Sequence, residues 1–195
     1  MHNHRFINEL NSLEATPING RFSTLVIGTF NSENQDGLNN DSLWYYGRCQ
    51  NEFWYLFPQI NGYQSLHQRD HPDISPRQLS VKWKDYCLQN RVVIVDIFKS
   101  ISTHLTSHSD SVIENPEQFV FFDYQTAFQQ VQFNNILFTW KSRTNKHILG
   151  RRKEEIHNWF SQKGSRILHM ITPSYAYRKR KEIKLESWLQ IYNAQ

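Results

Sequence analysis

The sequence contains little cysteine, glycine and proline and has no long apolar run. Its 195 residues include 2 Cys, 7 Gly and 6 Pro, which excludes a disulfide-rich scaffold, a cysteine-rich metal site and a collagen-like or low-complexity chain. No stretch approaches the ~18 apolar residues that a membrane helix requires, and the mean hydropathy is -0.67. The opening residues, MHNHRFINEL, lack the apolar segment of a secretory signal. We therefore expect a protein of the reducing cytoplasm with no membrane partner.

What the sequence has instead is the composition of a folded globular domain. Hydrophobic residues make up 38% of the chain, charged residues 21% and aromatic residues 14%. The 13 Phe, 9 Tyr and 6 Trp are enough to fill a core and also to line a binding cleft. Without repeats or linkers, a chain of this length is expected to form a single domain over residues 1–195.

Charge is distributed unevenly along the chain. Residues 1–140 contain 9 basic and 14 acidic side chains, whereas residues 141–195 contain 13 basic and 4 acidic ones, a net charge of +9. A basic segment of this kind is typical of proteins that bind a polyanion. The alternative is a set of solvated basic helix faces, and we favour nucleic acid over it.

Four short apolar runs have the character of buried strands. They are STLVIGT at residues 23–29, VVIVDIF at 92–98, NNILFT at 134–139 and RILHMIT at 166–172. Each run is apolar almost throughout, so both faces of the sheet are expected to be covered, which is typical of parallel strands.

Helical patterns separate these runs, at residues 51–60, 116–131, 151–162 and 178–192. Strands alternating with helices predict an α/β fold, a three-layer α/β/α sandwich with a short, mostly parallel central sheet. Ligands bind such sheets beyond the carboxyl ends of the strands. The segments of interest therefore follow Thr29, Asp96, Thr139 and Thr172.

The richest stretch is YYGRCQNEFW, residues 45–54, shortly after the first run. Its aromatic rings could stack on a base, and Asn51 carries a donor and an acceptor that could read a base edge or hold a water. The alternative is an aromatic helix start packed on the sheet, with Asn51 as its cap.

Two histidine pairs, His67/His71 and His104/His108, have the i,i+4 spacing of a helical metal site. Neither has the adjacent Glu of an HExxH motif, and no third ligand is evident, so no metal is expected. Phosphate-binding loops, dinucleotide fingerprints and nucleophile elbows are also absent from the sequence, which disfavours ATP-driven and dinucleotide chemistry. Asp96, at the end of a strand, suits either a general base or a cap for backbone N–H groups.

A basic helix start follows the fourth run. Thr172 and Ser174 flank a proline in a loop that leads to Tyr175 and to RKRK at residues 178–181. Hydroxyls and backbone N–H groups beside a helix start can bind phosphates. Basic side chains oppose the helix dipole at this end, which favours a phosphate partner over an ordinary solvated turn.

In this order, the segments resemble the uracil-DNA glycosylase superfamily, nearest to its mismatch-specific uracil and hypoxanthine-DNA glycosylase branches. Residues 45–54 are similar to the family's Tyr-Tyr-x-x-Pro-Arg-Asn-x-Phe-Trp, with matches at both tyrosines, Asn51, Phe53 and Trp54. Residues 27–32, IGTFNS, lie where the family has its first motif, a strand followed by Gly-x-x-Pro-Gly or similar.

The remaining motifs are less specific. VVIVDIFKSI at residues 92–101, followed by SDSVI at 109–113, is similar to the family's strand ending in Asp and its later Ser-x-Asp-x-x-Ile. ILFTWK at 136–141 lies where the family has Phe-Asn-Gly, and residues 172–176 lie where it has a loop that enters the minor groove. The resemblance spans roughly residues 24–192.

The resemblance implies a DNA glycosylase of base-excision repair, a hydrolase that flips a deaminated or mismatched base out of the duplex and cleaves its N-glycosidic bond. In active branches a polar residue of the first motif places the attacking water, but here that position is Phe30. The hypoxanthine branch uses the Asn of the second motif, so the resemblance assigns the water to Asn51, with Asn31 as second choice. The alternative, which Phe30 favours, is a catalytically inactive nucleic-acid-binding protein of the same fold.

The resemblance also assigns binding residues. Those expected to contact the base are Phe30, Tyr46, Phe53, Thr139 and Trp140. Those expected to contact DNA are Thr172, Ser174, Arg178 and Lys179 at phosphates, and Tyr175 as a wedge in the vacated stack. No metal or organic cofactor is implied, the partner is DNA with a damaged or deaminated base, and a monomer is expected.

Overall fold

A four-stranded parallel sheet lies at the centre of the computed structural model, in the order β3-β2-β6-β7. The strands are β2 (Gly20–Gly28), β3 (Val92–Asp96), β6 (Val131–Phe138) and β7 (Arg166–His169). Each overlaps one of the four predicted apolar runs. The residues that the structure describes are 2–31, 43–102, 117–140, 147–174 and 179–194.

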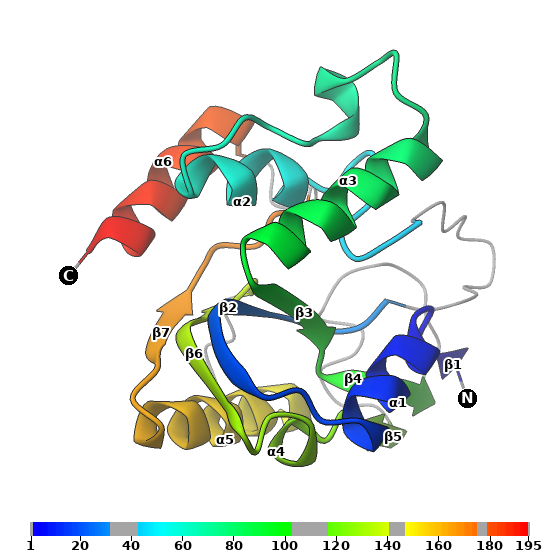
Figure 1. Cartoon of the computed structure of the whole chain (residues 1–195), viewed down its shortest axis with the longest axis vertical. Helices are drawn as coiled ribbons and strands as arrows, with labels where there is room; N and C mark the ends of the chain where they lie inside the picture. Colours follow the sequence, from blue (N-terminus) through cyan, green and yellow to red (C-terminus); the bar gives the residue numbers. More distant parts are fainter. Residues whose placement is uncertain (1, 32–42, 103–116, 141–146, 175–178, 195) are drawn as a thin grey trace.

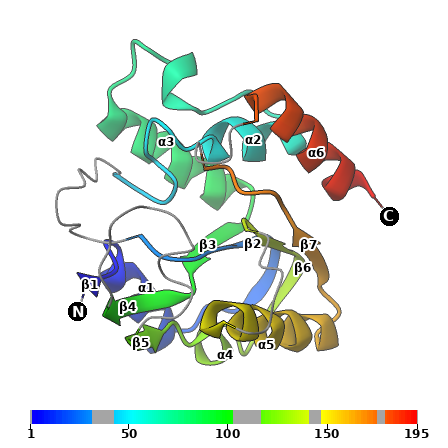
Figure 2. The ribbon, with the colours of Figure 1, turned by 180° about the vertical axis from the view of Figure 1, so that it is seen from behind.

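Helices cover both faces of this sheet (Figure 1). On one face lie α2 (Phe53–Ile60), α3 (Pro76–Gln89) and α6 (Lys181–Asn193). On the other lie α5 (Ile148–Gln162) and the short α4 (Tyr124–Ala127), with α1 (Ile7–Ala15) beside α4. The view from behind shows the same three layers (Figure 2), which confirms the predicted α/β fold. None of the helices in the described ranges is long and apolar enough to cross a bilayer.

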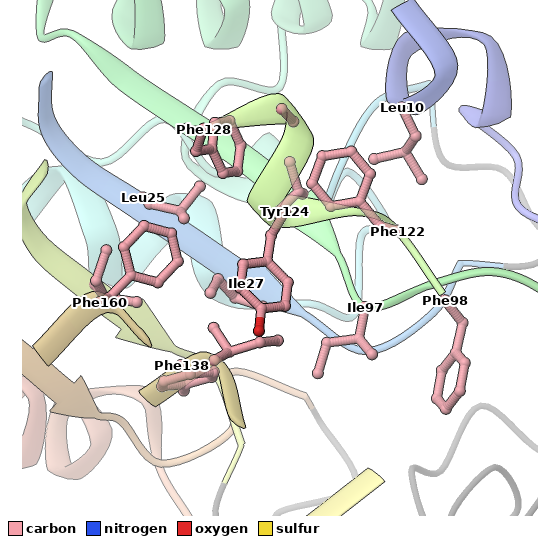
Figure 3. Close-up of a cluster of buried hydrophobic side chains, with 14 of the residues drawn as sticks. Leu10, Leu25, Ile27, Ile97, Phe98, Phe122, Tyr124, Phe128, Phe138 and Phe160 are labelled. Carbon is pink, nitrogen blue, oxygen red and sulfur yellow. The ribbon is translucent and has the colours of Figure 1, made fainter. Parts of the chain in front are cut away.

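Successive side chains of the central strands point into two separate cores. Leu25 and Ile27 pack into the core beneath α5, whereas Val26 between them packs into the core beneath α2 and α6. In the first of these cores the rings of Phe138 and Phe160 lie near Leu25 and Ile27 (Figure 3). Burial on both faces explains why the strand sequences are apolar almost throughout.

The predicted helix over residues 116–131 is wrong. Most of its described part is strand β5 (Gln118–Phe121) and the four-residue helix α4. The sequence QFVFF is rich in aromatic and β-branched residues, which favour a strand, and β5 pairs antiparallel with β4 (Phe98–Ser102). The run at residues 92–98 also divides, because β3 ends at Asp96 and β4 belongs to a second sheet.

The second sheet, β1-β4-β5, brings the first described residues beside the end of β2. Strand β1 (His2–Asn3) pairs antiparallel with β4. Next to it, the His4 N–H donates to the Lys99 carbonyl (2.8 Å) and the Arg5 N–H donates to the Asn31 carbonyl (2.7 Å). No sequence pattern singled out this segment, yet it lies against one of the predicted site residues.

Candidate functional site

The carboxyl ends of the central strands meet at one edge of the sheet, where the predicted base-contacting segments lie. Gly28 of β2 is in register with Asp96 of β3. Thr139, which follows β6, donates its backbone N–H to the Ile27 carbonyl (3.2 Å), and the half-buried Phe30 follows β2. Residues from the ends of three strands are therefore gathered at this edge.

Gly28 leaves the space in which two of these groups converge. A Cβ atom on this residue would lie 2.0 Å from Oδ1 of Asp96 and 2.4 Å from the hydroxyl oxygen of Tyr46. Both distances are far below any possible contact, so only glycine fits at the end of β2. The carboxylate and the phenol therefore lie side by side over the Gly28 backbone.

Tyr46 is held in this position by three constraints. Its backbone has a φ of 58°, in the left-handed region that non-glycine residues adopt at a cost. Its ring stacks on Phe53 with centroids 4.2 Å apart. Because the Thr139 hydroxyl donates to the Ile27 carbonyl (3.3 Å), it accepts a hydrogen bond from the Tyr46 hydroxyl (3.0 Å).

Asp96 is paired with a histidine that sequence analysis missed. Nε2 of His4 lies 2.8 Å from Oδ2 of Asp96, and the His4 and Asp96 residues are 0% and 5% exposed. Nδ1 of His4 accepts the Phe6 N–H (3.0 Å), so the ring proton is on Nε2 and the imidazole is a neutral donor to the carboxylate. The two residues are 92 positions apart, so no local spacing could have indicated the pair.

Tyr45 lies beside this pair. Its ring centroid is 5.7 Å from that of His4, and the side chain is buried. Burial, and then the negative charge of Asp96, raise the pKa of the Tyr45 phenol well above its ordinary value. Tyr45 is therefore a neutral wall of the site, and its next neighbour Tyr46 is the tyrosine that presents a hydroxyl to it.

The side chain of Asn51, the residue before the N-cap residue Glu52, accepts a hydrogen bond from the first turn of helix α2, which is close to the capping role predicted as the alternative. Its Oδ1 accepts the Phe53 N–H (3.0 Å), one of the N–H groups that the first turn of a helix leaves without a helical partner. The side chain is half-buried, so the amide is not enclosed by the core. A carbonyl oxygen has two lone pairs, and capping leaves one of them for a water.

A buried ion pair joins the aromatic motif to the loop after β7. Asn51 forms an antiparallel bridge with Ser174, and the Glu52 N–H donates to the Pro173 carbonyl (3.0 Å). Nζ of Lys184, in α6, donates to Glu52 Oε2 (2.5 Å) and to the Ser174 carbonyl (3.0 Å), and its residue is 0% exposed. Two motifs separated by more than a hundred residues thus form one rigid unit.

The predicted DNA-contacting residues lie along this unit and the start of α6. The Thr172 hydroxyl accepts the Ser174 N–H (3.2 Å), so that N–H is already used within the loop. Lys179 is exposed just before α6. Tyr175 and Arg178 lie outside the described residues.

Three of the predicted base-contacting residues are almost fully buried, among them Thr139, which is 5% exposed. Phe53 is 0% exposed, beneath Tyr46. Trp140 is 4% exposed; its ring packs edge-to-face on Phe138 (5.2 Å), and its carbonyl accepts a hydrogen bond from Nζ of Lys153 (2.6 Å). Trp140 therefore belongs to the core beneath α5, whereas Tyr46 and Thr139 meet at the sheet edge.

The described histidine pair lies at a short 3-10 turn, not along an α-helix. His67 and His71 flank a 3-10 turn (Gln68–Asp70), where Nδ1 of His67 accepts the Arg69 N–H and Nε2 of His71 lies 2.8 Å from the Ser65 carbonyl. In the described part of the chain, no three His, Cys, Asp or Glu side chains gather in a way that could hold a metal. The His104/His108 pair lies outside it.

Comparison with known proteins gives one informative result. No profile of a known protein family matches the sequence, and no curated protein matches it. A solution NMR structure of a candidate uracil DNA glycosylase from Methanosarcina acetivorans matches over 88% of this chain and 89% of that one, with a TM-score of 0.51 and 20% sequence identity. The chain has the fold of that protein.

The parallel arrangement of the strands makes this edge of the sheet the candidate site. In parallel α/β sheets the carboxyl ends of the strands are where ligands bind, and Gly28, Asp96 and Tyr46 converge there. His4 completes the edge from a segment outside the region of sequence resemblance.

Proposed function

We propose that the protein is a monofunctional DNA glycosylase that hydrolyses the N-glycosidic bond of a deaminated or mismatched base. The observation that carries the proposal is the convergence of a carboxylate, two hydroxyls and aromatic rings over Gly28, at the ligand-binding edge of a fold shared with a candidate uracil DNA glycosylase. Bond cleavage gives an oxocarbenium-like sugar and an anionic base, so such a site needs a group to orient water and donors toward the departing base.

The proposed chemistry distributes these tasks among the residues of the edge. The base flips out of the duplex and is bordered by Phe30 and by Tyr46, whose hydroxyl and that of Thr139 contact its polar edge. The carboxamide of Asn51 orients the attacking water. Phe53 supports the ring of Tyr46 from below, a role that agrees with their 4.2 Å stack.

The proposed DNA contacts lie on the rigid unit formed by the aromatic motif and the loop after β7. Thr172, Ser174 and Lys179 contact phosphates next to the lesion. The bridge between Asn51 and Ser174 supports this assignment, because it fixes the phosphate-binding loop relative to the water-orienting residue.

A second candidate function is a DNA-binding protein of the same fold without catalysis. Its support is Phe30, an apolar residue at the end of β2 where active branches of the superfamily carry a polar one. The deciding experiment incubates the protein with end-labelled duplexes that contain uracil, hypoxanthine, xanthine or mismatched thymine and scores abasic sites. Binding without base release from any duplex would establish the second candidate.

The role of Asn51 is tested on the base that the wild type releases. We expect Asn51→Ala to lower the rate by two to three powers of ten, because loss of a group that orients the reacting water costs about 3–4 kcal/mol of transition-state stabilisation. Asn31→Ala is the control and should lose little.

Loss of the helix cap must be separated from loss of chemistry. Asn51→Ala should also lower the free energy of unfolding by about 1 kcal/mol, whereas Asn51→Asp keeps an oxygen for the Phe53 N–H and should keep stability. The activity of Asn51→Ala is measured under conditions in which the variant is fully folded. If it then equals that of the wild type, Asn51 only stabilises the start of α2, and the assignment fails.

A further inference from the structure

Among the described residues that follow β2, which are Thr29, Phe30 and Asn31, none is a carboxylic acid or a histidine, but the neighbouring strand carries a carboxylate. Phe30 is the apolar residue at the position where a water-placing group is expected. Asp96 ends β3 in register with Gly28, and its Oδ1 occupies the space directly over the Gly28 Cα, next to the Tyr46 hydroxyl. A carboxylate thus lies one strand away from the expected place, at the same edge of the sheet.

The two oxygens of this carboxylate have different surroundings. Oδ2 points away from Gly28 to Nε2 of His4, at 2.8 Å. Oδ1 faces the edge where Tyr46 and Thr139 meet, and 6% of the Asp96 side chain remains exposed. One oxygen is fixed by the protein, and the other faces the proposed base site.

His4 is itself fixed as a donor. Its backbone N–H donates to Lys99 in β4, its Nδ1 accepts the Phe6 N–H, and its ring is packed edge-to-face against Phe30 (5.7 Å). With Nδ1 occupied as an acceptor, the only ring proton is on Nε2, directed at Asp96. The imidazole is fully buried, so it cannot rotate away without opening the β1–β4 contact.

We infer that Asp96 is the proton acceptor for the attacking water and that His4 is the positioning residue that holds it, an inference that rests on the proposed function. The water oxygen bonds to the anomeric carbon as the C–N glycosidic bond breaks, and the electron pair of that bond leaves with the base. The water proton passes to Oδ1 of Asp96, which becomes a neutral carboxylic acid, while His4 keeps its proton and its bond to Oδ2. The carboxamide of Asn51 can orient the water but is too weak a base to take its proton, so the two residues have separate tasks.

The test measures steady-state base release, which gives kcat and KM, and duplex binding by the full chain, on the duplex that the wild type processes. Asp96→Asn keeps the shape and the His4 contact but removes the basic oxygen, and kcat should fall by about 100-fold or more, as for loss of a general base, with Kd for the duplex within twofold. His4→Phe removes the donor and should lower kcat by at least tenfold without changing KM or Kd. His4→Gln retains an N–H that can reach Oδ2 and should restore most of this loss.

The matched control is Glu14→Gln. Glu14 attaches α1 to β4 through Lys99 (2.6 Å) and does not touch Asp96, so its substitution disturbs the attachment of the same segment and should leave kcat unchanged. If His4→Phe does not fold by circular dichroism, Asp96→Asn and the comparison of His4→Gln with wild type still decide the matter.

Three outcomes would overturn the inference. Retention of more than a tenth of wild-type kcat by Asp96→Asn, or equal losses in folded His4→Gln and His4→Phe, would leave the glycosylase function intact and remove the roles of these two residues. Base release from no duplex by the wild type would instead remove the proposed function, and the inference with it.

Discussion

At the scale of single residues, His169 at the end of β7 has a pKa well below that of a free histidine. Its ring stacks between Phe138 (centroids 5.3 Å apart) and His157 (5.3 Å). Burial, then the positive charge of Lys153, then His157 lower the pKa of His169 to about 4. The imidazole is therefore neutral in the folded protein at any pH near neutrality.

Acid should weaken the fold through this residue. An unfolded chain takes up a proton on His169 below about pH 6.5, whereas the folded one does so only near pH 4, so the free energy of unfolding should fall as pH drops through that window. Because the ring is only half-buried, we expect a loss of about 1–2 kcal/mol. Urea unfolding at pH 7.0 and pH 4.5 measures it.

His169→Phe supplies the comparison, since a phenyl ring preserves the stack on Phe138 and cannot titrate. Other groups contribute to acid sensitivity, among them His67, whose pKa burial lowers. The difference between the variant and wild type isolates His169. Equal losses in the two proteins would show that His169 is not responsible.

At the scale of elements, the contact of α6 with the start of α2 depends on Lys184. We expect Lys184→Met to lower the free energy of unfolding by about 2–4 kcal/mol, because it leaves the mostly buried carboxylate of Glu52 without its partner. Lys184→Met/Glu52→Gln should recover much of the loss. Lys181→Met is the matched control: its ion pair with Asp70 is exposed, so the change should be within about 0.5 kcal/mol. A small effect of Lys184→Met would contradict the importance of the Lys184–Glu52 ion pair.

Helices with a regular spacing of apolar residues and strands with a continuous apolar run were predictable. Elements defined by long-range pairing were not. The four central strands and helices α2, α5 and α6 follow from local patterns, with boundaries displaced by a few residues. β5 was predicted as part of a helix because its strand structure depends on antiparallel pairing with β4, which is distant in the sequence and which no local pattern indicates. α3 was missed although its capping box, Ser75 with Gln78, stands in the sequence directly before Pro76.

The residues of the candidate site also fall into those that local patterns predict and those that depend on long-range contacts. Tyr46, Phe53 and Thr139 could be predicted to lie together, because strand ends of a parallel sheet meet at one edge and the aromatic motif follows the first strand. The capping role of Asn51 was foreseen as an alternative. His4 could not be found, because its importance arises only from a tertiary contact with Asp96.

At the scale of the whole molecule, the basic segment is not one surface. Residues 141–195 include α5 and α6, and these helices lie on opposite faces of the sheet (Figure 1). The basic side chains in the described part of this segment are therefore divided between two sides of the protein. A duplex seated at the edge of the sheet near α6 would contact only some of them.

The salt dependence of the affinity for a DNA duplex should show that only part of the basic segment contacts it. With about four phosphates contacted near the start of α6, log K against log salt should have a slope of about -3.6, at about -0.9 for each contact. Lys179→Ala should reduce the slope by about 0.9 on every sequence, whereas Arg151→Ala, exposed on α5, should leave it unchanged. Fluorescence anisotropy of a labelled duplex between 50 and 200 mM salt, as an approximate range, measures both. A flat salt response would remove nucleic acid as the partner.

The proposed site can be lost in two ways, by unfolding of the whole molecule or by local opening of the two-residue strand β1. Short strands with few hydrogen bonds open locally more often than the whole structure unfolds. If residues 2–6 detach from β4, the molecule keeps its central sheet, its aromatic motif and the Lys184–Glu52 ion pair. Asp96, however, loses its hydrogen bond to the His4 imidazole. The fraction of molecules that are folded then exceeds the fraction in which His4 contacts Asp96. A melting curve reports the first fraction, whereas the rate of the proposed reaction would depend on the second.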